Sequence, residues 1–246
     1  MVCGLVIGRA GSVGFPGKNT FPVLGRPLAS YPLMAARDAA LVDRTYMSTD
    51  DPGLAKLARA YGAEVIERPA HLAESRALGE DVFKHGFEVI RDALSLEGQT
   101  VELMVLLFAN APTITAATID TGIEILRKQP EVDSAITVSR YNMWSPARAR
   151  RVDVDGLLKP FVDAAAVAAT CDRDSSGDVW FADQGVSVVR PSCLEHLESG
   201  LPPQRWMGQR IVPLDQWGGL DIDYEWQVPL AEFWLRAHGF EDYSPK

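Results

Sequence analysis

The sequence predicts an α/β fold in which helices cover a mostly parallel β-sheet. Short apolar runs that suit buried strands alternate with segments of helical periodicity, and the first of them follow a βαβαβ order. The 246 residues suffice for one large domain with its own core, and 47% of them are hydrophobic. We therefore expect a single domain over residues 1–246.

The expected elements follow one another along the whole chain. Strands are expected at 5–7, 44–48, 63–67, 101–108, 134–139 and 180–189. Helices are expected at 27–40, 52–61, 78–94 and 116–128, and again close to Pro229.

Local signals mark the ends of several elements. Pro27 suits the first turn of the first helix, although Pro32 is expected to delay its start by a few residues. Gly62 ends the second helix, and Thr115 is a suitable N-cap for the fourth. Asp155-Gly156 predicts a hairpin between residues 152 and 158.

Composition disfavours several classes of partner. The net charge is −9 and the pI is about 5.0, so no basic stripe is available to bind nucleic acid. No apolar stretch reaches the roughly 18 residues that a membrane span needs. The three cysteines are widely spaced and suit neither a disulfide framework nor a zinc ribbon. No basic segment precedes the first apolar run, so no signal peptide is expected, and we expect a cytoplasmic protein.

The most informative stretch is VCGLVIGRAGSVGFPGKN, residues 2–19, a strand that leads into a glycine-rich loop. Such loops hold phosphates, because glycine lets backbone N–H groups approach and cations supply charge. Arg9, Ser12 and Lys18 gather in this loop. Lys18 is followed by Asn19 rather than Ser or Thr, so the loop is not a Walker loop. The loop also does not match the dinucleotide-binding pattern GxGxxG. The alternative, an ordinary surface loop, is less favoured because these polar residues cluster.

The segment GRAGSVGFPGKN resembles the signature loop of the CMP-sugar-acid synthetases, whose usual form is close to ARGGSKGIPGKN. These are the acylneuraminate cytidylyltransferases and, more distantly, the CMP-KDO synthetases. The resemblance implies a three-layer, GT-A-like (Rossmann-like) nucleotidyltransferase fold that binds CTP on this loop. Val13 departs from the family, which often has Lys there.

The resemblance also implies a set of nucleotide-binding residues. Arg68 lies in a segment similar to the family's RPxxLA, where the arginine reaches the nucleotide, although it also reads as a solvated arginine before a proline turn. Asn110 follows the strand at 101–108, and ligands of open α/β sheets lie beyond such carboxyl ends. The expected nucleotide-binding residues are Gly8, Arg9, Ala10, Gly11, Ser12, Lys18, Asn19, Arg68 and Asn110.

Acceptor-binding residues are expected at Phe108, Arg173 and Gln184. The segment FANAPTIT stands where the family usually reads QPTSPLRT, so Phe108 and Ile114 replace a glutamine and an arginine. Gln184 takes the place of the asparagine in the family's NGAIYI strand, although a plain strand-entry residue is an equal alternative. Arg173 lies near an arginine that the family places close to the acceptor.

Two carboxylates near the end of the chain predict a metal site. The segment GLDIDYE resembles the family's SIDIDTE, and Asp221 and Asp223 would lie on one side of an extended segment. Two carboxylates suit Mg²⁺, which completes its shell with water and phosphate oxygens. The alternative is that Asp223 caps the following helix. The catalytic residues implied are Arg9, Lys18, Asp221 and Asp223.

The implied function is a cytidylyltransferase that joins CMP from CTP to an acidic acceptor, a sugar acid of the nonulosonate type, and releases pyrophosphate. In the family the region around 140–180 is an extension that packs on a second subunit, so a homodimer is expected. Transfer to a phosphorylated sugar or phosphonate, and nucleotide binding without turnover, remain as alternatives.

Overall fold

The computed structural model describes residues 1–11, 14–163, 170, 172, 174 and 177–244. The strands of its main sheet are β1 (Val2–Ile7), β4 (Arg44–Thr49), β5 (Glu64–Glu67), β6 (Leu103–Phe108), β7 (Ser134–Arg140), β10 (Trp180–Val189) and β11 (Ile211–Gln216). Two small hairpins pair β2 (Pro22–Val23) with β3 (Arg26–Pro27) and β8 (Arg150–Val152) with β9 (Leu158–Pro160). The helices are α1 (Ser30–Asp38), α2 (Pro52–Ala60), α3 (Ala70–Ala73), α4 (Gly79–Leu96), α5 (Ala116–Lys128), α6 (Pro191–Glu195) and α7 (Val228–Ala237).

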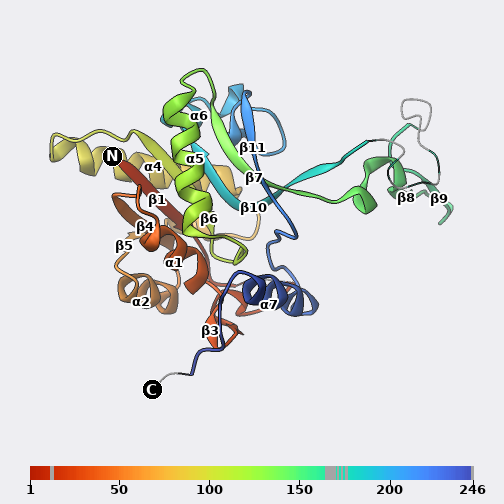
Figure 1. The fold of residues 1–246 in the computed structure, drawn as a ribbon, viewed down its shortest axis with the longest axis horizontal. Coiled ribbons are helices and arrows are strands. Elements are labelled where there is room, and N and C mark those ends of the chain that lie inside the picture. The colour runs from red at the N-terminus through yellow and green to blue at the C-terminus, as the bar shows by residue number, and fades with distance from the viewer. Residues whose placement is uncertain (12–13, 164–169, 171, 173, 175–176, 245–246) are drawn as a thin grey trace.

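The main sheet has the strand order β11-β7-β10-β6-β1-β4-β5 (Figure 1). Neighbouring strands run parallel except where β10 pairs with β6 and with β7. The predicted α/β fold with a mostly parallel sheet is therefore confirmed.

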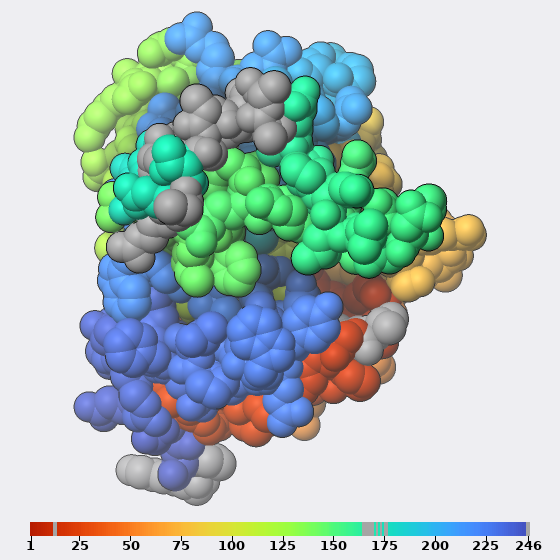
Figure 2. Space-filling model, turned by 90° about the vertical axis from the view of Figure 1, so that its right-hand side faces the viewer, coloured from red at the N-terminus to blue at the C-terminus, as the bar shows by residue number. Residues whose placement is uncertain are grey.

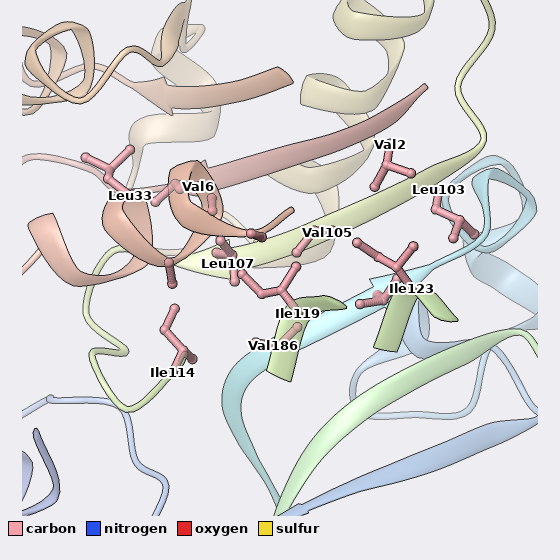
Figure 3. Packing of buried hydrophobic residues seen from close by; sticks show 14 of the residues in the cluster. Val2, Val6, Leu33, Leu103, Val105, Leu107, Ile114, Ile119, Ile123 and Val186 are labelled. Atoms are coloured by element: carbon pink, nitrogen blue, oxygen red, sulfur yellow. The ribbon is translucent and has the colours of Figure 1, made fainter. Parts of the chain in front are cut away.

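Both faces of the sheet are buried, which explains the unbroken apolar run of β6. Val105 and Leu107 belong to one buried cluster, whereas Met104 and Leu106 belong to another. Successive side chains of a strand point to opposite faces, so a strand covered on both sides is apolar throughout. Figure 3 shows the first cluster, in which Val105 and Leu107 lie close to Ile119 of α5.

The helices divide between the two faces. Leu33 of α1, Leu54 of α2 and Ile123 of α5 share the first cluster. The second cluster includes Phe83 of α4 and Leu194 of α6. Three layers result, a sheet between two layers of helices.

A third buried cluster joins α7 to the β2–β3 hairpin, which follows the glycine-rich loop. Val23 and Leu28 pack there with Trp234 and Leu235 of α7, and Ile222 is also buried among them. The cluster thus brings the segment around residue 222 next to the beginning of the chain.

The predicted start of the first helix is wrong. Pro27 belongs to β3, where it pairs with Pro22, and Leu28 N donates to Phe21 O at 2.9 Å. The helix begins only at Ser30, with Pro32 in its first turn, so the expected delay is confirmed. This tight local hairpin, which turns at Leu24 and Gly25 with positive φ values, decides the boundary.

Other predicted boundaries are confirmed. Thr115 Oγ1 accepts from Thr118 N at 3.2 Å and caps α5. The Asp155-Gly156 turn connects β8 to β9, with Gly156 at a φ of +76°.

The β8–β9 hairpin and the residues leading to it form an arm that projects from the body (Figure 1). Figure 2 shows the arm, in green, crossing above the blue C-terminal segment, with the surface hollowed between them. Large apolar side chains of the arm are exposed: Met143, Trp144, Val152, Val154, Leu157, Leu158 and Phe161.

Among the described residues, no helix combines the length and apolar composition that crossing a membrane requires.

Candidate functional site

A pocket of ≈ 340 Å³ opens where β1 and β6 end. It is formed by the strand ends, by the glycine-rich loop, by α4 and by residues 219–225, which contain Asp221 and Asp223 and are called the carboxylate segment below. Its lining residues are Ile7, Gly8, Arg9, Gly14, Lys18, Asn19, Arg68, Leu72, Ala77, Gly79, Val82, Phe108, Asn110, Asp223 and Tyr224. This is the edge at which open α/β sheets bind ligands.

The chain turns tightly into the pocket at Gly8. Gly8 N donates to Ser48 O at 3.2 Å, and a Cβ atom there would lie 2.7 Å from the Cβ of Ala109. Real Cβ atoms do not approach so closely, so only glycine fits between β4 and the residue after β6. Arg9 follows directly and also lines the pocket.

Two guanidinium groups line the pocket without carboxylate partners. Arg9 donates to the carbonyl oxygens of Gly11 at 3.1 Å and Ala73 at 3.4 Å. Arg68 is buried and donates to Ser48 O at 2.6 Å. Burial lowers the pKa of Arg68 to about 10. In the described part of the chain neither arginine forms an ion pair, so their charge is available to an anionic ligand.

Lys18 and Asn19 lie in a short 3₁₀ turn, Lys18–Thr20, that Gly17 introduces with a φ of +74°. Lys18 Nζ lies 2.6 Å from Asp223 Oδ1. Asn19 Nδ2 donates to Arg9 O at 3.3 Å, while its Oδ1 is buried without a partner. An unsatisfied buried oxygen is costly, and a hydrogen-bond donor on a ligand would satisfy it.

Asp221 and Asp223 form an electrostatically coupled pair. Asn110 Nδ2 donates to Asp221 Oδ2 at 3.3 Å, and Ile222 N donates to Asn110 O at 2.8 Å. Burial raises the pKa of Asp221 above its usual range, the charge of Asp223 adds to the effect, and Lys18 opposes it. A carboxylate whose charge is disfavoured by a neighbouring carboxylate suits a cation.

The donor set fits Mg²⁺. The described residues hold no cluster of three or more acids, histidines or cysteines that could enclose a metal. A divalent ion at Asp221 and Asp223 would take its remaining ligands from water and phosphate, as Mg²⁺ prefers.

Asp223 does not cap the last helix. Gln227 Oε1 accepts from Asp223 N at 2.7 Å and from Tyr224 N at 2.8 Å, so a glutamine side chain fixes this turn. The carboxylate of Asp223 bonds to Lys18 instead. The alternative role of Asp223 as a cap is therefore wrong.

Phe108 gives the pocket an apolar wall. Its ring lies 5.2 Å from that of Phe83 and 6.1 Å from that of Trp206, both edge-on. Leu72 and Val82 line the same pocket. This part of the site favours an apolar portion of a ligand.

Gln184 lies outside the pocket lining, at a bulge of β10 between Ala182 and Ser187. Its φ is +63°, which is uncommon for a residue with a side chain, and its Oε1 is buried without a partner. Because Ser187 pairs with Leu106 of the antiparallel β6, the bulge lies beyond the carboxyl end of that strand. Strained residues of this kind gather at functional sites.

The structure thus brings together most of the expected site residues. The main pocket is lined by Gly8, Arg9, Lys18, Asn19, Arg68, Phe108, Asn110 and Asp223. Ala10 and Gly11 line a hollow of ≈ 20 Å³ that shares Arg9, Lys18 and Asn19. Asp221 lines neither of these hollows but accepts a hydrogen bond from Asn110, whereas Ser12, Val13 and Arg173 fall outside the described residues.

Sequence reasoning missed several lining residues. Two had a readable signal: Gly79 and Val82 are three apart in the first turns of a helix, so they share a face. Tyr224 directly follows an expected site residue. Leu72 and Ala77 carry no chemistry that would single them out. The missed residues are Ile7, Leu72, Ala77, Gly79, Val82 and Tyr224.

Comparison with known proteins adds sequence relatives. A family model described as "Cytidylyltransferase" matches residues 3–154. The chain is 23% identical to the N-acylneuraminate cytidylyltransferase of Escherichia coli over 141 residues, 57% of this chain and 32% of that protein. It is 22% identical to the N-acylneuraminate cytidylyltransferase of Oncorhynchus mykiss, over 97% of this chain and 51% of that protein. It is 28% identical to the pseudaminic acid cytidylyltransferase of Campylobacter jejuni, over 45% of this chain and 46% of that protein. The chain thus spans about a third to a half of the length of these relatives.

Solved structures resemble the chain over nearly its whole length. CMP:2-keto-3-deoxy-manno-octonic acid synthetase complexed with CTP gives a TM-score of 0.66 at 14% identity and covers 97% of this chain and 99% of its own. The 4-diphosphocytidyl-2C-methyl-D-erythritol synthase of Anaerococcus prevotii gives 0.62 at 13% identity, with 96% of each chain covered. At such identities the likeness shows the fold alone, and the expected GT-A-like architecture is confirmed.

Proposed function

Because the chain belongs to the cytidylyltransferase family, we propose that it transfers CMP from CTP to an acidic acceptor and releases pyrophosphate. The proposed acceptor is a sugar acid of the nonulosonate type, the class to which the names of several relatives point. One observation carries the proposal: Arg9 and Arg68 face one pocket, and among the described residues neither has a carboxylate partner. Such a pocket favours an anion as charged as a nucleoside triphosphate.

The loop residues bind the nucleotide in this proposal. Lys18 and Arg9 hold the triphosphate, and the backbone around Gly11, at a φ of +74°, presents N–H groups to it. Arg68 and Asn19 lie deeper: the buried guanidinium of Arg68 adds positive charge for the anionic nucleotide, and the buried amide oxygen of Asn19 bonds to a polar edge of the nucleoside. Asn110 lines the same pocket, and its side-chain amide donates a hydrogen bond that holds Asp221 in place.

The transfer step needs positioning and charge neutralisation rather than covalent catalysis by the protein. A hydroxyl oxygen of the acceptor attacks the α-phosphorus, its proton leaves to solvent, and the bond to the pyrophosphate oxygen breaks. Lys18 and Arg9 neutralise charge on the departing pyrophosphate. Asp221 and Asp223 would hold Mg²⁺, which when bound supplies positive charge to the phosphate oxygens.

Phe108 and Gln184 shape the acceptor side of the proposed site. Phe108 presents an apolar wall backed by Phe83 and Trp206, so an acceptor with an apolar substituent fits better than one that is hydroxylated all round. Gln184 offers an unsatisfied amide oxygen near the same edge of the sheet.

Measurement of pyrophosphate release tests the function. The protein is mixed with CTP, Mg²⁺ and a panel of nonulosonic acids, 3-deoxy sugar acids, phosphorylated sugars and phosphonates. We expect release only with CTP and a sugar acid, and loss of release in Arg68→Met. Release with phosphorylated sugars or phosphonates alone would assign the other acceptor class. CTP binding without release from any acceptor would identify a nucleotide-binding protein without turnover.

We also propose that the protein is a homodimer that the arm assembles. The exposed apolar side chains of the arm, among them Val154 and Phe161, are unusual on a solvated surface and suit burial against a second copy.

The free, buried thiols of Cys3 and Cys193 are compatible with a reducing, cytoplasmic location.

A further inference from the structure

One ion pair connects the two chemical parts of the site. Lys18 of the glycine-rich loop and Asp223 of the carboxylate segment are 205 positions apart, yet Lys18 Nζ lies 2.6 Å from Asp223 Oδ1. The lysine side chain is 14% exposed and that of the aspartate 56%. Each group serves as counter-ion to the other, although the proposed function assigns them different ligands.

The backbones of both partners are held in place. Ile222 N donates to Asn110 O and Asp223 N to Gln227 Oε1, so the carboxylate segment is fixed on both sides. Lys18 N donates to Phe15 O at 3.2 Å and belongs to a 3₁₀ turn. The ion pair therefore opens by rotation of the long lysine side chain, not by movement of a loop.

We propose that the Lys18–Asp223 ion pair is a latch that makes the nucleotide and the divalent cation bind cooperatively. The inference rests on the proposed function, since it takes CTP and a cation as the ligands. When both bind, the ammonium group of Lys18 moves to phosphate and the carboxylate of Asp223 turns to the cation. Both charged groups of the broken ion pair then contact a ligand of opposite charge.

Either ligand alone meets a penalty. A triphosphate that takes Lys18 leaves Asp223 as an unpaired negative charge beside the phosphates. A cation that takes Asp223 lies close to the ammonium group of Lys18. Like charges at such separations repel, so each ligand removes the penalty of the other. The coupling is reciprocal: the cation strengthens nucleotide binding by the factor with which the nucleotide strengthens cation binding.

Calorimetric titration with CTP in EDTA tests the latch. Asp223→Asn has no ion pair to break, so we expect it to bind metal-free CTP about two- to fivefold more tightly than the wild type, the range that a half-exposed ion pair provides. Its additional gain from Mg²⁺ should be smaller than that of the wild type. The matched control is Glu225→Gln, which removes the same charge from an exposed neighbour.

The outcomes of this titration separate the latch from other effects. Equal tightening in Asp223→Asn and Glu225→Gln would indicate a general charge effect and overturn the latch. Unchanged or weaker metal-free binding by Asp223→Asn would overturn it as well. A wild type that binds no CTP even with Mg²⁺ would overturn the proposed function and the latch together.

A second titration does not depend on CTP. Mn²⁺ binding to the nucleotide-free protein is followed by electron paramagnetic resonance in the wild type, in Lys18→Met and in Lys128→Met. Loss of the ammonium group should tighten Mn²⁺ binding about two- to fivefold in Lys18→Met alone. Lys128, which pairs with Glu124 on the surface, controls for net charge. Equal Mn²⁺ affinities in the three proteins would overturn the latch, even if CTP is bound and turned over.

Discussion

The side-chain amide of Asn110 donates to the carboxylate of Asp221 at 3.3 Å and joins the end of β6 to the carboxylate segment. Its Nδ2 also donates to Ile222 O at 3.1 Å, so one asparagine fixes two consecutive residues. The partner that it holds is a partly buried acid, and the protein keeps this acid although its partial burial disfavours the ionised form. The proposed role of Asp221 in holding a cation would therefore cost stability at this position.

Asp221→Asn should be more stable than the wild type at pH 7. Burial and the charge of Asp223 raise the pKa of Asp221, so the folded state binds this proton more tightly than the unfolded state. The stabilisation from the proton is present at low pH and is lost as the pH rises through the raised pKa. Asparagine does not ionise, so the variant does not lose this stabilisation as the pH rises. Thermal melts over a pH series should show an advantage that shrinks toward the usual aspartate pKa of about 3.9. An advantage independent of pH, or a less stable variant, contradicts this account.

Lys18→Ala should bind CTP in the presence of Mg²⁺ at least about tenfold more weakly than the wild type, since a hydrogen bond to a charged group contributes about 1.5–3 kcal/mol. Isothermal titration measures the affinity. Lys128→Ala removes the same charge from an exposed pair with Glu124 and should bind as the wild type does. Wild-type affinity in Lys18→Ala would remove the lysine from the nucleotide site.

N-acetylneuraminic acid should be a poor acceptor, because Phe108 offers an apolar wall where a polyhydroxylated ligand needs hydrogen bonds. We expect kcat/KM for it to be lower than for acidic acceptors with apolar substituents. Phe108→Gln should bring the two kcat/KM values closer together, whereas Phe87→Leu, a change on the buried face of α4, should leave their ratio unchanged. The expectation is wrong if N-acetylneuraminic acid is the fastest of all the acids tested.

Thr115→Ala should lower the free energy of unfolding by about 1 kcal/mol, the usual contribution of an N-cap. The hydroxyl oxygen accepts from Thr118 N and no other described residue caps α5. Thr115→Ser keeps the hydroxyl and should retain most of the stability. Urea unfolding of both variants measures the difference. Equal losses in the two would show that the methyl group, not the cap, stabilises the helix.

Phe161→Asp should convert the proposed homodimer to a monomer, since it places a charge on the apolar arm. Sedimentation velocity or light scattering measures the mass. Leu96→Asp changes another exposed apolar residue, at the end of α4 and far from the arm along the chain, and should leave the dimer intact. A wild-type protein that is already a monomer at micromolar concentration would refute the proposed assembly.

Local chemistry made part of this structure predictable. The apolar run within 101–108 indicated a central strand, and the hydroxyl of Thr115 indicated the start of α5. Neither inference needs a partner distant in sequence. Pro27 was misassigned because its conformation depends on pairing with Pro22 across a small hairpin.

The site was predictable as a set of residues but not as an arrangement. Motif resemblance identified Lys18 and Asp223, yet no sequence rule shows that they bond to each other across 205 positions. The wall at Phe108 was visible only as a lost polar residue, because Trp206, which backs it, comes from a segment without a motif. Gln184 adopts its unusual φ because a bulge of β10 requires it, and bulges depend on the neighbouring strand.

The contact between Lys18 and Asp223 also has a consequence for biosynthesis. A ribosome that adds 5–20 residues per second makes Asp223 about 10–40 s after Lys18. The glycine-rich loop therefore leaves the exit tunnel long before the carboxylate segment is translated. During that interval the nascent chain can form β1, β4 and β6 around the loop, but not the segment that completes the site. The proposed site is therefore completed late in translation, and a chain stalled before residue 221 would present Arg9 and Lys18 without the carboxylates that are proposed to hold the cation.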